Sequence, residues 1–380
     1  MTDIGGRPRR RDRRKRIIGA AAAGAVVLGV AVAVVEPYAN DWWVTRNACG
    51  GSLPEGVLED LGAGRADDDG HLYAHEETLD ERLGRYRCEV NDASSGRGYR
   101  FRASAYTSRD DVERRLSDDF SGREPARLAL PAGLPGYESQ RGDLVLTLDC
   151  PRLGEGGSGK PRKLHTRAQI PGYFGDDESG DEPGIGSSYD AGARAAVALA
   201  NKASENLRCG AETLEVPAEV TRPEPVPLEE TAGTPCAALA RAPLTREDTW
   251  SVQVRMSKRA PVGSCLLERE RDGAESGRAA EKTEVLDLTA FHGDFSEGLW
   301  KAAGREKPWV SGTEGWATAR CGGTEAVFRA RALGGDGRTP VLSAGEVRSV
   351  LADFAERQAA RRGCTQPQVP PGISDSGPRG

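Results

Sequence analysis

Hydrophobic residues are most concentrated in one uninterrupted stretch near the N-terminus. Residues 17–35, from Ile17 to Val35, include no charged or strongly polar side chain, and no other part of the chain has a comparable apolar run. A helix of this length would be about 28 Å long, close to the hydrocarbon thickness of a bilayer. The pattern predicts a single transmembrane helix at residues 17–35.

Charges and aromatic residues beside this stretch predict its orientation. Residues 1–16 carry eight basic side chains, and Tyr38, Trp42 and Trp43 follow the other end. Positive charge marks the cytoplasmic side of a membrane helix, and aromatic rings favour the interface. We therefore expect a single-pass protein of the cell membrane, with a basic cytoplasmic tail (1–16), an uncleaved signal anchor and extracytoplasmic C-terminal domains. A cleaved signal peptide is the alternative, but its apolar core is usually shorter.

Small residues recur every four positions within the predicted anchor, at Ala21, Ala25, Gly29 and Ala33. Such a stripe lets two membrane helices approach closely, so it predicts helix pairing and a homodimer. An alanine-rich segment also produces this spacing by chance, and both interpretations stay open.

After residue 44 the pattern changes to short strand-like segments and helices, and it passes through the same order twice. The first set comprises 86–90, 99–106, 108–120, 144–150, 163–170 and a helix from Ser187. The second set comprises 265–267, 284–288, 289–303, 315–321, 325–333 and a helix from Ser343. Turn-rich connections between strands favour hairpins. We predict an α+β fold in which the transmembrane helix precedes two tandem ββαββα-like domains with antiparallel sheets.

The closing helix of each set has recognisable ends. Ser187 with Asp190, and Ser343 with Glu346, have the spacing of capping boxes. In the second helix the apolar residues fall on one face, at Val347, Val350, Leu351 and Phe354. Gly210 and Gly363 stand where the helices should stop.

Eight cysteines lie beyond the predicted anchor, in two groups of four: Cys49, Cys88, Cys150, Cys209, and Cys236, Cys265, Cys321, Cys364. An even number outside the cytoplasm predicts disulfides. Zinc is a poor alternative, because there is no Cys-x-x-Cys pair and the four histidines are scattered, at His71, His75, His165 and His292. Sequence alone leaves the connectivity open, but pairing first with second and third with fourth would suit both groups.

The boundaries between domains follow from composition. Residues 216–235 separate the two cysteine groups and are rich in proline and glutamate, which is typical of an extended linker. We therefore predict extracytoplasmic domains at 44–215 and 236–364. The proline- and glycine-rich tail, 365–380, is predicted to be disordered.

The overall charge of −6 conceals an uneven distribution. Residues 1–16 carry +6, and the remaining chain carries −12. An acidic ectodomain argues against nucleic-acid binding. Only 37% of residues are hydrophobic, which excludes a polytopic membrane protein and predicts small cores that benefit from disulfides.

These features together resemble a known kind of protein. A basic N-terminal tail, one Ala/Gly/Val-rich anchor and an Arg/Ala/Gly/Asp-rich ectodomain with paired cysteines are similar to exported single-pass proteins of unknown function from high-GC actinobacteria. The resemblance covers residues 1–364. It implies duplicated four-cysteine extracytoplasmic α+β domains and supplies no catalytic residues.

Candidate motifs for chemistry are weak. Residues 154–161 approach a P-loop, but Pro161 stands where Ser or Thr should bind magnesium, so we interpret them as a turn. The acidic clusters 67–69 and 176–182 lack EF-hand spacing and are interpreted as solvated loops. There is no Gly-x-Ser-x-Gly elbow. Trp300 and Trp309 could line a ligand groove, although core packing is the commoner role of tryptophan.

We therefore expect no catalytic residue, cofactor or metal. The predicted function is non-catalytic binding or interaction outside the cytoplasm, with a protein or cell-wall partner. One alternative is an extracytoplasmic hydrolase with an unrecognised active site. Another is a structural membrane component that dimerises through its transmembrane helix.

Overall fold

A computed structural model describes most of the chain after the predicted anchor. The described residues are 43–44, 46–62, 73–92, 99–120, 128–130, 133–139, 142–155, 161–170, 185–218, 224–244, 248–258, 260–271, 281–303, 308–311, 313–333 and 342–371. The predicted span 17–35, with Ala21, Ala25, Gly29 and Ala33, lies outside them. In the part of the chain that is described, none of the helices combines the length and the apolar character that crossing a bilayer requires.

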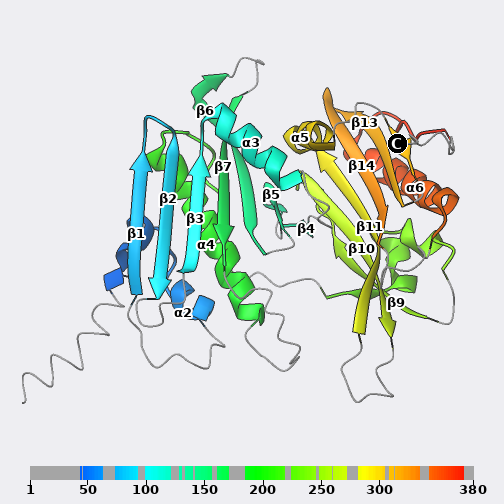
Figure 1. Cartoon of the computed structure of the whole chain (residues 1–380), viewed down its shortest axis with the longest axis horizontal. Helices are drawn as coiled ribbons and strands as arrows, with labels where there is room; N and C mark the ends of the chain where they lie inside the picture. The colour runs from blue at the N-terminus through cyan, green and yellow to red at the C-terminus, as the bar shows by residue number, and fades with distance from the viewer. Residues whose placement is uncertain are drawn as a thin grey trace, which may run out of the picture.

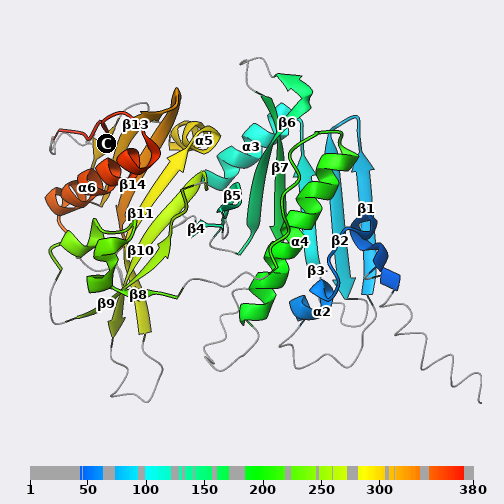
Figure 2. The same ribbon diagram turned by 180° about the vertical axis from the view of Figure 1, so that it is seen from behind.

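The first unit is a seven-stranded antiparallel sheet with a long helix on one face (Figure 1, Figure 2). Its strand order is β1-β2-β3-β7-β6-β5-β4. The strands are β1 (Tyr73–Asp80), β2 (Arg85–Asp92), β3 (Tyr99–Tyr106), β4 (Leu128–Ala129), β5 (Gly136–Glu138), β6 (Leu144–Glu155) and β7 (Pro161–Gln169). The helices are α2 (Val57–Gly62), α3 (Arg109–Phe120) and α4 (Ile185–Asn206). Figure 2 shows α4 across one face, and Figure 1 shows β1, β2 and β3 without a helix over the opposite face.

The second unit has a seven-stranded antiparallel sheet of its own, in the order β12-β13-β14-β11-β10-β9-β8. Its strands are β8 (Val226–Pro227), β9 (Thr249–Arg255), β10 (Val262–Arg271), β11 (Glu281–His292), β12 (Trp309–Val310), β13 (Glu314–Cys321) and β14 (Thr324–Ala332). Two short 3₁₀ segments, η2 (Leu228–Gly233) and η3 (Leu239–Arg241), precede β9. The helices are α5 (Asp294–Ala303) and α6 (Ala344–Arg362).

The two units share one topology. The order β1-β2-β3-β7-β6-β5 in the first sheet corresponds to β9-β10-β11-β14-β13-β12 in the second. In both units a helix follows the third strand and a longer helix closes the unit, so α3 corresponds to α5 and α4 to α6. The antiparallel α+β architecture is confirmed, and the repeated order of segments is reproduced in the strand order.

Each unit nevertheless has more strands than the predicted ββαββα pattern. The strands β1 and β9 precede the cysteine-bearing strands, and the short strands β4, β5 and β12 add to the far edge. The predicted helix 289–303 is also partly wrong, because β11 continues to His292 and α5 begins at Asp294. Residues 289–292 pair in register with β14, from Thr289 opposite Arg329 to His292 opposite Ala326. Pairing between strands therefore outweighs the local helical pattern there.

The ends of the closing helices agree with the sequence in one unit only. Ser343 caps α6 in a complete capping box with Glu346, and Gly363 ends it with a left-handed φ of 67°. The predicted cap Ser187 is wrong, because α4 already begins at Ile185. Asp190 instead forms an ion pair with Arg194 inside the helix, at 3.2 Å between Oδ2 and Nε. A cap needs the first turn to start just after it, and here the turn starts earlier.

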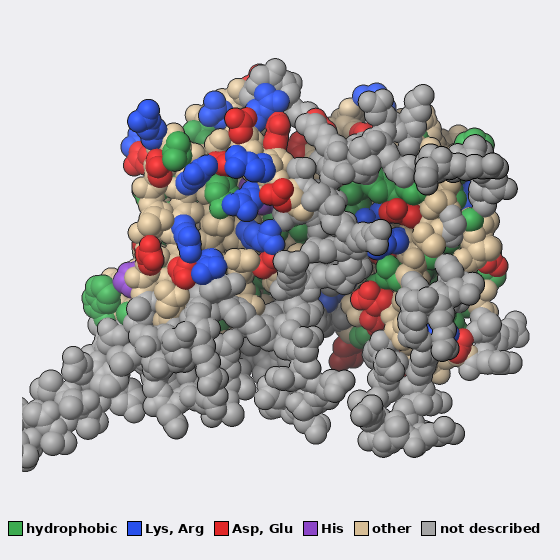
Figure 3. Space-filling model, viewed as in Figure 1, with side chains coloured by type: hydrophobic (Ala, Val, Ile, Leu, Met, Phe, Trp, Pro, Cys, Tyr) green, Lys and Arg blue, Asp and Glu red, His purple; other side chains and the backbone are tan. Residues whose placement is uncertain are grey.

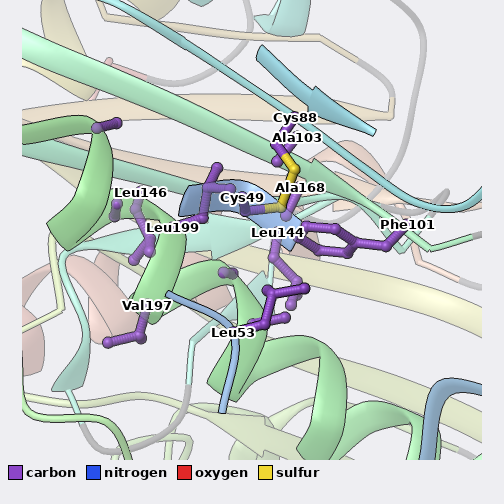
Figure 4. Packing of buried hydrophobic residues seen from close by; sticks show 14 of the residues in the cluster. Cys49, Leu53, Cys88, Phe101, Ala103, Leu144, Leu146, Ala168, Val197 and Leu199 are labelled. Atoms are coloured by element: carbon purple, nitrogen blue, oxygen red, sulfur yellow. A yellow bond between two sulfur atoms is a disulfide. The ribbon is translucent and has the colours of Figure 1, made fainter. Parts of the chain in front are cut away.

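Alanine lets α4 lie close to the first sheet. Its buried face includes Ala193, Ala196, Ala200 and Ala203 together with Val197 and Leu199. Figure 4 shows Leu199 beside Leu146, and Phe101 beside Leu144 further along the same cluster, to which Val197 also belongs. The Cys49–Cys88 disulfide lies in the same cluster. The disulfide therefore stabilises a core in which each alanine side chain buries little apolar area.

All eight cysteines form disulfides, in the order expected for both groups: Cys49–Cys88, Cys150–Cys209, Cys236–Cys265 and Cys321–Cys364. In each unit the first bond ties the entrance to β2 or β10. The second ties β6 or β13 to the end of the closing helix. Four disulfides indicate an oxidising, extracytoplasmic location for this part of the chain.

The two units pack through equivalent helices, α3 against α5 (Figure 1). An interunit cluster of buried apolar residues joins them: Val112, Leu116, Tyr137, Val145, Val262, Phe291, Phe295, Leu299, Trp316 and Val327. A buried ion pair lies at the same interface, with 3.2 Å between Arg255 Nη1 and Glu138 Oε2. The Arg255 guanidinium also lies 5.9 Å from the Tyr189 ring.

Parts of the predicted linker and tail are folded. Val226 and Leu228 pack against the second core, so the C-terminal part of 216–235 is built into the second unit. The expectation of disorder from residue 365 is wrong for 365–371, because Gln368 and Thr318 exchange backbone hydrogen bonds of 2.7 and 3.2 Å. The backbone of β13 beyond its pairing with β12 supplies these hydrogen bonds. Residues 372–380 lie outside the described part.

Candidate binding groove

A groove of about 980 Å³ lies beside the outer edge of the second sheet, where β8 and β9 meet η2 and η3. Its lining residues are Glu224, Pro225, Pro227, Leu228, Glu229, Ala240, Ala242, Leu244, Asp248, Thr249, Trp250, Ser251 and Glu270. We call this the acidic groove. It is open to solvent and lies beside a sheet edge, so it suits an extended ligand better than a small enclosed one.

The walls of the acidic groove are held by pairing and by a disulfide. Strand β8 pairs with β9, Val226 opposite Val252 and Pro227 opposite Ser251. Proline lacks a backbone donor and is tolerated in an edge strand. In η2 the buried Thr231 donates its hydroxyl to Leu228 O at 2.6 Å, which fixes the turn after β8. The Cys236–Cys265 bond then ties the following segment to β10.

The lining has one sign of charge. Glu224, Glu229, Asp248 and Glu270 contribute carboxylates, and none of the described lining residues is basic. The remaining surface is largely apolar, from prolines, alanines, two leucines and Trp250. Such a surface attracts positive charge and buries apolar side chains at the same time. It therefore fits a ligand that combines basic and apolar groups.

A second polar cluster lies on the sheet of the same unit, away from α6. Asp287 is fully buried, accepts from Arg329 at 3.1 Å and accepts from the Thr289 hydroxyl at 2.6 Å. Glu284 stands opposite Glu268 at a bulge between β10 and β11. Burial raises the pKa of Glu284, and the negative charges of Asp287 and Glu268 add to the effect. These side chains form a polar network across β10, β11 and β14.

The three described histidines lie apart from one another. His75 lies on β1, 5.6 Å from the Trp43 ring, and His165 is buried on β7. His292 is buried at the end of β11, with its Nδ1 4.0 Å from Cys321 Sγ. Burial lowers the pKa of His292 to about 3. His71 lies outside the described residues.

The other motifs considered from sequence are also placed where they can be described. The P-loop-like segment joins two paired strands, because Glu155 at the end of β6 pairs with Pro161 at the start of β7. The acidic clusters 67–69 and 176–182 lie outside the described residues. Trp309 stacks on the buried Trp316, with 6.4 Å between ring centroids. The side chain of Trp300 is not described.

The acidic groove could not be assigned in advance from the sequence. Glu224 and Glu229 lie in the segment interpreted as a linker, and Trp250 lies in β9, a strand that is not among those predicted from the sequence. A proline-rich acidic stretch close to a tryptophan was the only signal. Its interpretation depends on β8 pairing with β9, which joins residues some 25 positions apart.

Within the described residues, no group of three or more His, Cys, Asp or Glu side chains is arranged to hold a metal ion. Comparison with family models, with curated proteins and with solved structures finds no match.

Proposed function

We propose that this chain is an anchored extracytoplasmic binding protein whose acidic groove takes up a basic, extended segment of a partner protein. The observation that carries the proposal is the lining of the groove, which joins four carboxylates to an apolar surface without a described basic residue. Charge of one sign over an apolar surface favours a partner with alternating basic and apolar side chains.

The size of the groove supports an extended segment. About 980 Å³ lies in the upper range of ligand pockets, and the groove is open to solvent. It also lies beside the sheet edge at β9, where, among the described residues, the two residues of β8 pair along the outer side. An extended chain can lie along such an edge while its side chains alternate between the groove and solvent.

The anchor belongs to the same proposal. The apolar run 17–35 and the basic residues before it support a signal anchor, and the four disulfides support an ectodomain outside the cytoplasm. In this arrangement the protein presents the acidic groove at the outer surface of the cell membrane.

A peptide titration tests the groove. The full chain is extracted from the membrane fraction in nonionic detergent, and its recovery there checks the anchor. The probe is a fluorescent peptide of alternating lysine and valine, with a peptide of alternating glutamate and valine as control. We expect saturable binding of the basic peptide only, weakened by salt because exposed charges are screened.

Matched variants locate the site. The triple variant Glu229→Gln/Asp248→Asn/Glu270→Gln should weaken the affinity about tenfold, since each solvent-accessible charge contributes roughly 0.5 kcal/mol. The control triple Glu81→Gln/Glu113→Gln/Glu205→Gln removes exposed carboxylates of the first unit and should bind as the unaltered chain does. Equal binding by both triples, or binding of the acidic peptide, would contradict the proposal.

A further inference from the structure

The open face of the first sheet, opposite α4, carries a set of arginines, some of which share a carboxylate in pairs. We call Arg85, Arg87, Arg102, Arg114, Arg115 and Arg167 the arginine band. They come from β2, β3, β7 and α3. In Figure 3, Lys and Arg side chains gather over β2 and β3 in the middle of this face, and acidic side chains lie around them.

Two buried carboxylates each hold a pair of these arginines. Glu89 accepts from Arg102 through both oxygens, at 2.8 and 3.0 Å, and from Arg87 at 2.5 Å. Asp111 accepts from Arg85 at 2.9 and 3.0 Å, and from Arg114 at 2.9 Å. In each group two guanidinium groups therefore share one carboxylate.

The carboxylates are buried and the arginines that hold them are more exposed. Side chains of Glu89 and Asp111 are 11% and 9% exposed. Those of the arginines range from 23% for Arg167 to 60% for Arg114. The arginine hydrogen bonds lower the pKa of Glu89 to about 2 and also lower the pKa of Asp111. Both carboxylates therefore stay ionised at any physiological pH and keep the arginines in place.

The remaining arginines extend the band across the sheet. Arg167 donates Nε to Asp143 at 3.1 Å, and Ser104 lies opposite both Arg87 and Arg167 in the strand register. Arg115 lies over the Tyr106 ring, 5.1 Å from its centroid. The six guanidinium groups outnumber the three carboxylates that hold them, and the acidic residues Asp80 and Glu76 of β1 border the band, opposite Arg85 and Glu89.

We propose that the arginine band binds an anionic polysaccharide, one that bears repeated phosphate, sulfate or carboxylate groups. Planar guanidinium groups that are already oriented recognise such groups in a bidentate manner. Cα atoms two residues apart on a strand are about 6.8 Å apart and neighbouring strands about 4.8 Å, so the band presents positive charge at regular intervals.

The residues between the arginines favour a hydrated polymer over other polyanions. Thr78, Ser104 and Gln169 stand beside them in the register and offer hydroxyl and amide groups. A membrane surface would call for apolar side chains among the basic ones. Single-stranded nucleic acid would call for a row of aromatic rings, whereas Tyr106 supplies one ring, beneath Arg115.

The test uses the full chain in nonionic detergent and immobilised dextran sulfate, with uncharged dextran as control. We expect binding to dextran sulfate alone, with an affinity that falls steeply with salt. Mixed micelles containing phosphatidylglycerol, added as competitor, should not displace the protein. Absence of binding to dextran sulfate, or displacement by the lipid, would overturn the proposal.

Variants that keep the fold intact locate the surface. Arg85→Gln/Arg87→Gln leaves one arginine on each buried carboxylate, and should weaken binding about tenfold and reduce the salt slope by about two. Arg208→Gln/Arg241→Gln removes two exposed arginines elsewhere and should bind unchanged. If both double variants lost affinity equally, binding would depend on net charge alone, and the assignment to the arginine band would be wrong.

A further variant separates a built site from diffuse charge. Glu89→Gln makes the chain more positive but removes the ionised group that holds Arg87 and Arg102. A site that depends on oriented arginines should lose affinity, about threefold or more. Tighter binding by Glu89→Gln would contradict that dependence. Circular dichroism of every variant checks the fold, and none of these results depends on the acidic groove.

Discussion

At the scale of single residues, His292 shows how far burial can change a side chain that the sequence leaves undefined. The sequence places it in a segment that we predicted as helical, so nothing indicated its environment. In the structure it lies against Cys321 Sγ and 6.1 Å from the Phe328 ring. Burial, and to a smaller extent the charge of Arg362, lowers the pKa of His292 to about 3.

This shift predicts a loss of stability in mild acid. The unfolded chain takes up a proton on His292 below about pH 6.5, whereas the folded chain does so only near pH 3. Stability therefore falls as pH drops through this window, by about 2 kcal/mol between pH 7 and pH 5 from this residue. Urea denaturation at both pH values checks this. Between pH 7 and pH 5, His292→Leu should lose about 2 kcal/mol less stability than the unaltered chain does.

The neighbouring variant Phe328→Leu is the control for packing. It alters the same contact without removing a titrating group, so its cost should be equal at pH 7 and pH 5. A pH dependence of His292→Leu that matches the unaltered chain would rule out this account of His292.

At the scale of elements, the sequence predicts best where one face is buried and the ends are marked. The helix α6 has both features, a stripe of buried apolar residues and a capping box, and it was predicted well. The strand β1 has neither. Residues 76–80 are exposed on both faces at the sheet edge, so the strand shows no alternation. Its pairing with β2 depends on tertiary contacts, which a single sequence does not display.

The two predicted caps provide a test at this scale. Ser343→Ala removes the side chain that accepts from the Glu346 backbone and should cost about 1 kcal/mol of stability. Ser187→Ala, at the equivalent position of the sequence, replaces a residue inside α4 and should cost much less, because alanine is favoured within a helix. Thermal denaturation of both variants checks the difference. Equal losses would mean that Ser343 does not act as a cap.

At the scale of the whole molecule, the sequence indicated the repeated order and the cysteine pairs, because each unit carries its own signals. It gave no indication of the contact between units. That contact joins Arg255 of β9 to Glu138 of β5, with side chains 2% and 0% exposed. Residues more than a hundred positions apart form this pair, and neither is marked by its neighbours in the sequence.

The buried pair predicts coupling between the two units. Arg255→Met removes the arginine partner of a buried carboxylate and should destabilise the protein by about 3 kcal/mol. Arg255→Met/Glu138→Gln removes both charges and should recover most of that loss. Chemical denaturation of both single variants and the double gives the coupling energy. Additive losses in the double would contradict the buried pair.

The packing of α3 against α5 has a consequence for how the two units associate. These helices are equivalent in the two units, so their contact joins like to like. Because both units belong to one chain, this contact forms within the molecule and does not depend on protein concentration.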